Sequence, residues 1–273
     1  MRSAKRPLSL RHALALGLLQ GPTELLPVSS SAHTELLPWL AGWPYAELDG
    51  ELRKSFEVAL HAGAGAALAI ALRRELMQDI SRIDRRSAQV LALSLAPPVV
   101  VGFALRGPIE RLFGGPRSTA CGLAGGAVAM ALADRRGRTA QQERACTDAQ
   151  PRDGLALGLA QACALMPGVS RNGATLTAAR ARGFGRGTAH ALSWSVALPV
   201  IVGASALKGW RLRDVAPEAR AGLAVGGASA FASTLLSARL LRAGERGKRA
   251  LWPYALYRCA LAGMVATRVR GSH

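Results

Sequence analysis

Five long runs without a charged residue constrain this chain more than any other feature of its sequence. A helix that crosses the hydrocarbon core of a bilayer needs roughly 20 mostly apolar residues. One such run could form a buried core helix, but the shell of a 273-residue soluble protein cannot cover five of them. The pattern therefore predicts an all-α, polytopic membrane protein, and an alanine-rich soluble helical protein is the alternative. The runs cover 87–105, 118–133, 154–170, 187–207 and 221–238.

The basic charge of the chain fits a membrane protein. Lys and Arg total 35 against 17 Asp and Glu, which gives a net charge of +18. Most of these basic residues lie between the apolar runs, where they would face lipid headgroups. A nucleic-acid binder would interleave clustered basic residues with aromatic ones, and only 5% of the residues are aromatic. We therefore expect membrane lipids, and no nucleic acid, among the partners.

Two segments, 12–40 and 154–180, differ from the other apolar stretches because Pro, Gly and polar residues interrupt them. Both run from a Gln through an apolar turn to a Pro and then to a hydroxyl-rich stretch. We interpret this similarity as an internal repeat within a single membrane domain, 1–267. Half one covers about 12–133 and half two about 154–267, while the tail 268–273 resembles the remnant of an expression tag.

The remaining stretches predict about six full spans. If the two interrupted segments are re-entrant hairpins, each half crosses the membrane three times, and this odd number inverts the second half. Inverted-topology repeats with broken helices near the midplane are a recurring arrangement for membrane substrate sites. Arg258 lies inside one span, where we expect it to snorkel or to pair with a buried acid. The expected spans are 55–72, 88–105, 118–133, 188–207, 218–239 and 251–267.

The second interrupted segment carries a pattern suited to binding an oxyanion. Arg171 offers a planar fork of donors that matches phosphate oxygens. Ser170, Asn172 and Thr175 can donate further hydrogen bonds around it. A helix restarting near Ser170 would add unpaired backbone N–H groups and the positive end of its dipole. These features predict a phosphate-binding cradle.

The first interrupted segment offers reacting groups. A serine hydroxyl is a weak nucleophile unless a base takes its proton, and His33, three residues beyond Ser30, titrates near neutral pH. Ser29 adds a second hydroxyl to the phosphate-binding set. Glu24 could orient His33, act as the base, or hold a divalent cation such as Mg²⁺. Together the two segments suit hydrolysis of a phosphate ester or anhydride.

Both motifs resemble the signatures of the undecaprenyl-diphosphate phosphatase family of the bacitracin-resistance type. Residues 20–33, QGPTELLPVSSSAH, resemble its first signature, an (E/Q)xxxE element joined to PxSS(T/S)xH. Residues 167–175, PGVSRNGAT, resemble the second, PGxSRSxxT. The resemblance implies a multi-pass enzyme of the bacterial inner membrane with its site open to the outer face. Its activity would be removal of one phosphate from undecaprenyl diphosphate, which regenerates the carrier for peptidoglycan assembly and confers bacitracin resistance.

The resemblance also implies roles for single residues. Ser30 matches the serine proposed as nucleophile and His33 the essential histidine, although His33 could itself attack. Glu24 matches the second acidic residue of the first motif. Family activity usually depends on a divalent cation, Mg²⁺ or Ca²⁺, which implies Glu24 with Gln20 as ligands. The matches to phosphate-binding residues are Ser170, Arg171 and Thr175.

Three departures from the family pattern bear on activity. Gln20 stands where many members have Glu, which would weaken metal binding or shift it to Glu24. Ala32 replaces the usual Gly before the histidine, and Asn172 replaces a Ser but can still donate hydrogen bonds. The alternative function is a prenyl-phosphate carrier transporter or flippase that needs only the Arg171 clamp. The sequence leaves a homodimer open.

Overall fold

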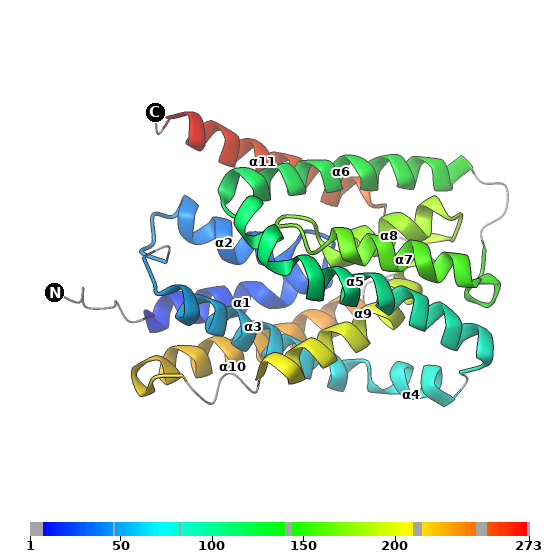
Figure 1. The fold of residues 1–273 in the computed structure, drawn as a ribbon, viewed down its shortest axis with the longest axis horizontal. Helices are drawn as coiled ribbons and strands as arrows, with labels where there is room; N and C mark the ends of the chain where they lie inside the picture. Colours follow the sequence, from blue (N-terminus) through cyan, green and yellow to red (C-terminus); the bar gives the residue numbers. More distant parts are fainter. Residues whose placement is uncertain are drawn as a thin grey trace. The chain divides into compact units, whose positions relative to one another are not determined.

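The described part of the chain is helical throughout. The computed structural model describes residues 8–45, 47–81, 83–139, 144–209, 215–243 and 250–271. Within them, eleven α-helices and one short 3-10 helix form, with no β-sheet (Figure 1), so the all-α prediction is confirmed. The elements are α1 Leu10–Leu25, α2 Ser30–Leu40, α3 Gly50–Ala71, α4 Arg73–Ser81, α5 Arg85–Leu112, α6 Pro116–Thr139, η1 Cys146–Asp148, α7 Pro151–Cys163, α8 Arg171–Ala181, α9 Arg186–Gly209, α10 Pro217–Ala243 and α11 Trp252–Gly271.

The helices follow the expected pattern of spans and interruptions. Each of the six expected spans corresponds to one long helix, and each interrupted segment forms two shorter helices, α1 with α2 and α7 with α8. Within the described residues, two helices are long and apolar enough to cross a membrane by length and composition, α5 over Arg85–Leu105 and α10 over Pro217–Leu241. The helices therefore agree with a helical membrane protein, and the number of crossings stays a prediction.

Unit 1 is a bundle of α1, α3 and α10, in which α10 packs against both other helices. Gly21 approaches α10 so closely that a Cβ there would overlap Ser233. The Gly21 N–H donates to Ser233 Oγ at 3.0 Å, and that hydroxyl donates to the Gly17 carbonyl at 3.1 Å. Small residues suit such contacts because they bring helix backbones together. The unit comprises Met1–Leu25, His33–Arg73 and Leu198–Ala243.

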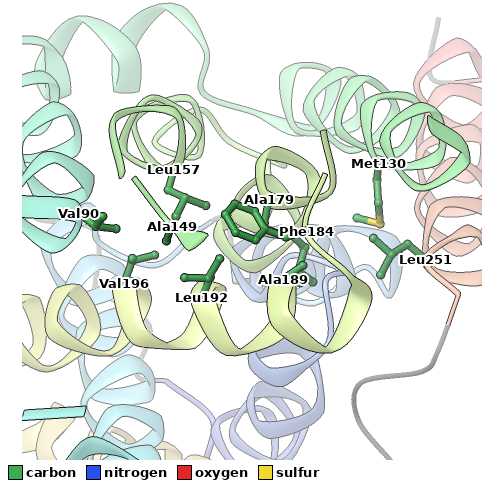
Figure 2. Packing of buried hydrophobic residues seen from close by; sticks show 11 residues of the cluster. Val90, Met130, Ala149, Leu157, Ala179, Phe184, Ala189, Leu192, Val196 and Leu251 are labelled. Carbon is green, nitrogen blue, oxygen red and sulfur yellow. The ribbon is translucent and has the colours of Figure 1, made fainter. Parts of the chain in front are cut away.

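Unit 2 contains both turns that carry the sequence motifs. In it α5 packs on α7, α7 on α8, and α6 on both α8 and α11. The buried Phe184 ring lies at the centre of its apolar core, with Leu157 from α7 and Leu192 from α9 close by (Figure 2). Met130 of α6 and Leu251 extend the same core (Figure 2). The unit comprises Leu26–Ala32, Arg74–Ala197 and Gly244–His273.

The two units do not coincide with the two halves of the sequence. In unit 1, α1 of the first half packs against α10 of the second. In unit 2, α7 of the second half packs against α5 of the first. Each interrupted segment thus places its first helix against a long helix of the other half. The single membrane domain 1–267 stays a prediction.

Candidate active site

The turn between α7 and α8 is built so that a serine caps the second helix. Gly168 has φ 83°, and a Cβ there would overlap the Thr119 carbonyl, so both backbone angle and space require glycine. Ser170 follows as the N-cap of α8, and its Oγ accepts a hydrogen bond from the Gly173 N–H at 3.1 Å. Arg171 is the first residue of α8 and is half-buried. The motif arginine therefore starts a helix whose N-terminus favours anions.

Asn172 and Thr175 belong to a buried hydrogen-bond network. Ser193 of α9 donates to Asn172 Oδ1 at 3.0 Å, and its hydroxyl lies 2.5 Å from that of Thr175. All three residues are buried. The structure thus gives Asn172 and Thr175 interior partners that hold the first turn of α8. Sequence reasoning did not identify Ser193, because a lone serine in an apolar run carries no distinguishing signal.

The turn between α1 and α2 repeats the same capping arrangement. Ser29 has φ 77°, a left-handed conformation that is costly for a residue with a Cβ and that often marks functional sites. Its Oγ accepts from the Ala32 N–H at 3.4 Å and lies 3.3 Å from Ser31 Oγ. Ser29 precedes α2 as Ser170 precedes α8. Its hydroxyl therefore caps a helix in addition to any contact with substrate, and the half-buried Ser30 begins α2.

Arg258 of α11 connects the two motif turns within unit 2. Its guanidinium donates to the Pro27 carbonyl at 3.4 Å and to the Gly168 carbonyl at 3.3 Å, with a third bond to Gly122 at 3.4 Å. The side chain is only 1% exposed, and its Nε is buried without a hydrogen-bond partner in the described ranges. Among the described residues it pairs with no carboxylate. The sequence-based expectation for Arg258 was therefore wrong, since it neither snorkels nor pairs with an acid.

Two glycines make room for this buried arginine. A Cβ on Gly126 of α6 would overlap the guanidinium, and a Cβ on Gly173 of α8 would lie 2.8 Å from its Nη1. Space for Arg258 is therefore provided by the sequences of both neighbouring helices. The charge is expensive to bury without an anionic partner, which makes a functional role the default interpretation. The sequence signal that could have found this role is an arginine inside an apolar run.

The acidic part of the predicted site lies in unit 1. Gln20 Nε2 donates to Glu24 Oε2 at 3.0 Å, and His61 Nε2 lies 3.9 Å from the same oxygen. His61 Nδ1 is 2.8 Å from the Glu57 carbonyl, which can only accept, so Nδ1 carries the proton when this bond forms. In the neutral ring Nε2 then keeps its lone pair. His33 is buried on α2, one helical turn after Ser30.

These residues suit a hard divalent cation. Gln20 Oε1 is buried with no hydrogen-bond partner among the residues that the structure describes, so an amide oxygen remains available beside the Glu24 carboxylate. Mg²⁺ is commonly bound by one or two carboxylates while its other positions go to water and substrate phosphates. No group of three or more His, Cys, Asp and Glu side chains suited to a metal occurs among the described residues. Glu24, Gln20 and His61 would therefore form a sparse site that substrate completes.

Comparison with known proteins decides the family. The family model described as "Bacitracin resistance protein BacA" matches residues 13–264. The chain belongs to the BacA family. It is 38% identical to an undecaprenyl-diphosphatase of Geobacter metallireducens over 268 residues, which cover 92% of this chain and 95% of the relative. An undecaprenyl-diphosphatase of Pelobacter propionicus is 37% identical over 276 residues, with coverage of 95% and 97%.

The family assignment agrees with the resemblance found in the sequence and makes the chain a membrane protein. Both motif turns lie inside the matched region. Unit 2 brings the Pro27–Ser29 and Pro167–Ser170 turns together around Arg258. Gln20, Glu24 and His33 belong to unit 1 and stay predicted site residues. Arg258, Ser193 and His61 are the additions that the structure makes to the candidate site.

Proposed function

We infer that this chain is an undecaprenyl-diphosphate phosphatase, which hydrolyses undecaprenyl diphosphate to undecaprenyl phosphate and inorganic phosphate. The observation that carries this conclusion is Arg258, whose guanidinium donates to carbonyls of both motif turns. It places the serine-rich turn and the Ser170–Arg171 turn around one buried positive charge. The relatives are named for this activity, and none of those named above is a transporter.

The second turn would bind the diphosphate. Arg171 presents a fork of donors at the start of α8, where the positive end of the helix dipole also favours an anion. Asn172 and Thr175, fixed by Ser193, hold this turn in place. Arg258 adds a buried positive charge that contacts this turn through the Gly168 carbonyl, and the negative charge of the diphosphate would compensate it. This arrangement favours a transition state in which negative charge spreads over the phosphoryl oxygens.

The first turn would supply the nucleophile. Ser30 Oγ attacks the terminal phosphorus while His33 takes its proton, and the bond between this phosphorus and the bridging oxygen breaks. Undecaprenyl phosphate leaves, and water then hydrolyses the phosphoserine to release inorganic phosphate. Direct attack by His33, with a phosphohistidine in place of the phosphoserine, is the alternative. A divalent cation held by Glu24 and Gln20 would neutralise charge on the diphosphate oxygens.

The architecture we propose is six spans with two re-entrant hairpins in an inverted repeat. Helix packing between the two halves of the sequence supports this architecture, because α1 packs against α10 and α7 packs against α5. The capping serines support it further, since Ser29 and Ser170 open the second helix of each hairpin. We place the enzyme in the bacterial inner membrane with its site open to the outer face, in the presence of membrane lipids. A homodimer remains compatible with this arrangement.

Phosphate release from a long-chain prenyl diphosphate in detergent tests the function. Wild type should release phosphate, and Ser30→Ala should lower the rate at least about a thousandfold if Ser30 is the nucleophile. Arg171→Ala should lower it at least about a hundredfold. Arg117→Ala is the matched control, because Arg117 is an exposed arginine in the first turn of α6, and it should keep wild-type turnover.

Two further arms separate the parts of the proposal. EDTA should stop turnover and Mg²⁺ or Ca²⁺ should restore it, and Gln20→Glu should lower the cation concentration required. Full activity in EDTA would remove the cation from the proposal, and full activity of Arg171→Ala would remove the clamp. A folded wild type that binds the lipid diphosphate but releases no phosphate would favour the carrier transporter.

A further inference from the structure

A cavity of about 540 Å³ lies in unit 2 at the far end of the α7–α8 hairpin from its motif turn. Four arginines, one aspartate and Gln150 line most of it. The motif turn follows the C-terminus of α7, whereas the cavity lies at the N-terminus of α7 and the C-terminus of α8. We propose that this cavity binds the phosphate group of an anionic phospholipid headgroup. The charged residues are Arg86, Arg144, Arg152, Arg182 and Asp148.

A buried carboxylate fixes two of the arginines before any ligand arrives. Asp153 is fully buried and accepts two hydrogen bonds from Arg144, at 2.7 and 3.2 Å. It also accepts one from Arg182 Nε at 2.7 Å. The Arg144 guanidinium stacks over the Phe184 ring, with its Cζ 4.2 Å from the ring centroid. The floor of the cavity is therefore rigid, and less side-chain entropy is lost on binding.

Other donors in the cavity are available to a ligand. Arg182 uses only its Nε on Asp153, and its two terminal nitrogens have no hydrogen-bond partner in the described part of the chain. Arg86 and Arg152 are exposed and donate to no described residue. Besides Asp153, two carboxylates face this region: Asp148 lines the cavity, and Asp84 attracts Arg86. The arginines outnumber these acids, so the cavity favours a single phosphate diester.

The position of the cavity matches the level of lipid headgroups. The candidate membrane-spanning part of α5 begins at Arg85, and a second cavity of about 470 Å³ lined by Arg85 and Arg86 adjoins this region. Glycines at positions 154 and 158 bring α7 against Val90 and Leu93 of α5, so the two helices run parallel and start side by side. The N-termini of α5 and α7 therefore both lie beside the basic cavity, where their helix dipoles favour an anion.

Exposed apolar side chains farther along α7 and α5 suit acyl chains. On α7, Leu155 and Leu159 are exposed one and two turns beyond the cavity. On α5, Val99, Val100 and Phe103 are exposed within the membrane-spanning segment, Phe103 to 95%. A free phosphate would use only the arginines. A phospholipid would fill the basic cavity with its headgroup and cover the exposed apolar side chains with its tails, so the structure favours the lipid.

Native mass spectrometry of the full chain in neutral detergent tests this proposal with phosphatidylglycerol and phosphatidylcholine as probes. Wild type should retain phosphatidylglycerol and bind phosphatidylcholine at least about tenfold more weakly. The double variant Arg86→Gln/Arg152→Gln should bind phosphatidylglycerol about tenfold more weakly than wild type. The matched control is Arg135→Gln/Arg136→Gln, which removes two exposed arginines from the end of α6 and should bind as wild type does.

Three outcomes would overturn the proposal. Equal binding of the two lipids would show no selection for anionic headgroups, and equal losses in both double variants would show only a net-charge effect. Displacement of phosphatidylglycerol by an equal concentration of inorganic phosphate would show a free-anion site. Turnover in detergent without added lipid should be unchanged in both double variants. A failure of the lipid site is thereby distinguished from a failure of the phosphatase assignment.

Discussion

Unit 2 contains two clusters around arginine side chains, and they differ in how the positive charge is compensated. At the end of the α7–α8 hairpin remote from its motif turn, Arg144 and Arg182 share the carboxylate of Asp153 at distances down to 2.7 Å. At the motif turns, Arg258 is more deeply buried, yet within the described part of the chain only carbonyls bind it, at 3.3 to 3.4 Å. Breaking a buried ion pair is strongly destabilising, whereas removing a buried charge that lacks a counterion relieves a penalty. The first centre therefore stabilises the fold, and the proposed role of the second is to keep a positive charge for an anionic substrate.

The largest expected effect follows from removing the uncompensated charge. Arg258→Met should lower kcat/KM for a prenyl diphosphate at least about a hundredfold, because it removes a preorganised charge from the transition state. The thermal midpoint should stay the same or rise, since the apolar side chain fits a buried position without the desolvation penalty. Steady-state phosphate release and thermal unfolding in detergent measure the two quantities on one preparation.

A conservative variant separates charge from packing at this position. Arg258→Lys keeps the charge but loses the fork that reaches both turns, so its activity should fall between those of wild type and Arg258→Met. If Arg258→Met unfolded several degrees below wild type, Arg258 would stabilise the fold, which contradicts the expected difference between the two centres. If Arg258→Lys were no more active than Arg258→Met, the positive charge at this position would not contribute to activity.

The paired centre should respond in the opposite sense. Asp153→Asn leaves Arg144 and Arg182 without their shared counterion, and the unfolding free energy should fall by about 1–3 kcal/mol. Both arginines are partly exposed, which limits the loss. Turnover per folded molecule should stay near wild type, because the motif turn lies at the other end of the hairpin. Loss of activity without loss of stability would contradict a structural role for Asp153.

The pH dependence of this difference follows from the pKa of Asp153, which lies outside the membrane-spanning segments. Burial raises that pKa, but hydrogen bonds from Arg144, Arg182 and the Gln150 N–H outweigh burial and lower it to about 2. An acid with a depressed pKa contributes its full stability above the unfolded value, about 3.9. The stability gap between wild type and Asp153→Asn should therefore be constant near neutral pH and shrink as pH falls from about 4 to 2.

The sequence predicted those parts of the fold that depend on local pattern. Apolar runs located the long helices, and the Pro-containing interruptions located the turns before α2 and α8. Both motifs named residues that the structure places at helix starts, namely Ser29, Ser30, Ser170 and Arg171. Of these helix starts, only the one near Ser170 was expected from the sequence, because serine is a preferred N-cap and the free N–H groups that follow favour an anion.

Long-range partners could not be predicted in the same way. Arg258 reaches Pro27 across most of the chain, and no local pattern around Arg258 encodes a carbonyl as its partner. His61 Nδ1 bonds to the Glu57 carbonyl one turn earlier, but its Nε2 lies beside Glu24, a contact that spacing along the chain does not indicate. In both cases the tertiary fold selects the partner. The exchange of helices between the two halves has the same origin.

The smallest expected effect concerns the uncharged hydrogen-bond network of Asn172, Thr175 and Ser193. Ser193→Ala removes the donor to Asn172 Oδ1 and a partner of Thr175. A lost buried hydrogen bond of about 1 kcal/mol should lower kcat/KM about fivefold if the network positions the α8 turn. Ser195→Ala is the matched control, since that hydroxyl donates to the Leu192 carbonyl of its own helix. Equal activity in both variants would show that the hydrogen bonds of Ser193 do not position the α8 turn for catalysis.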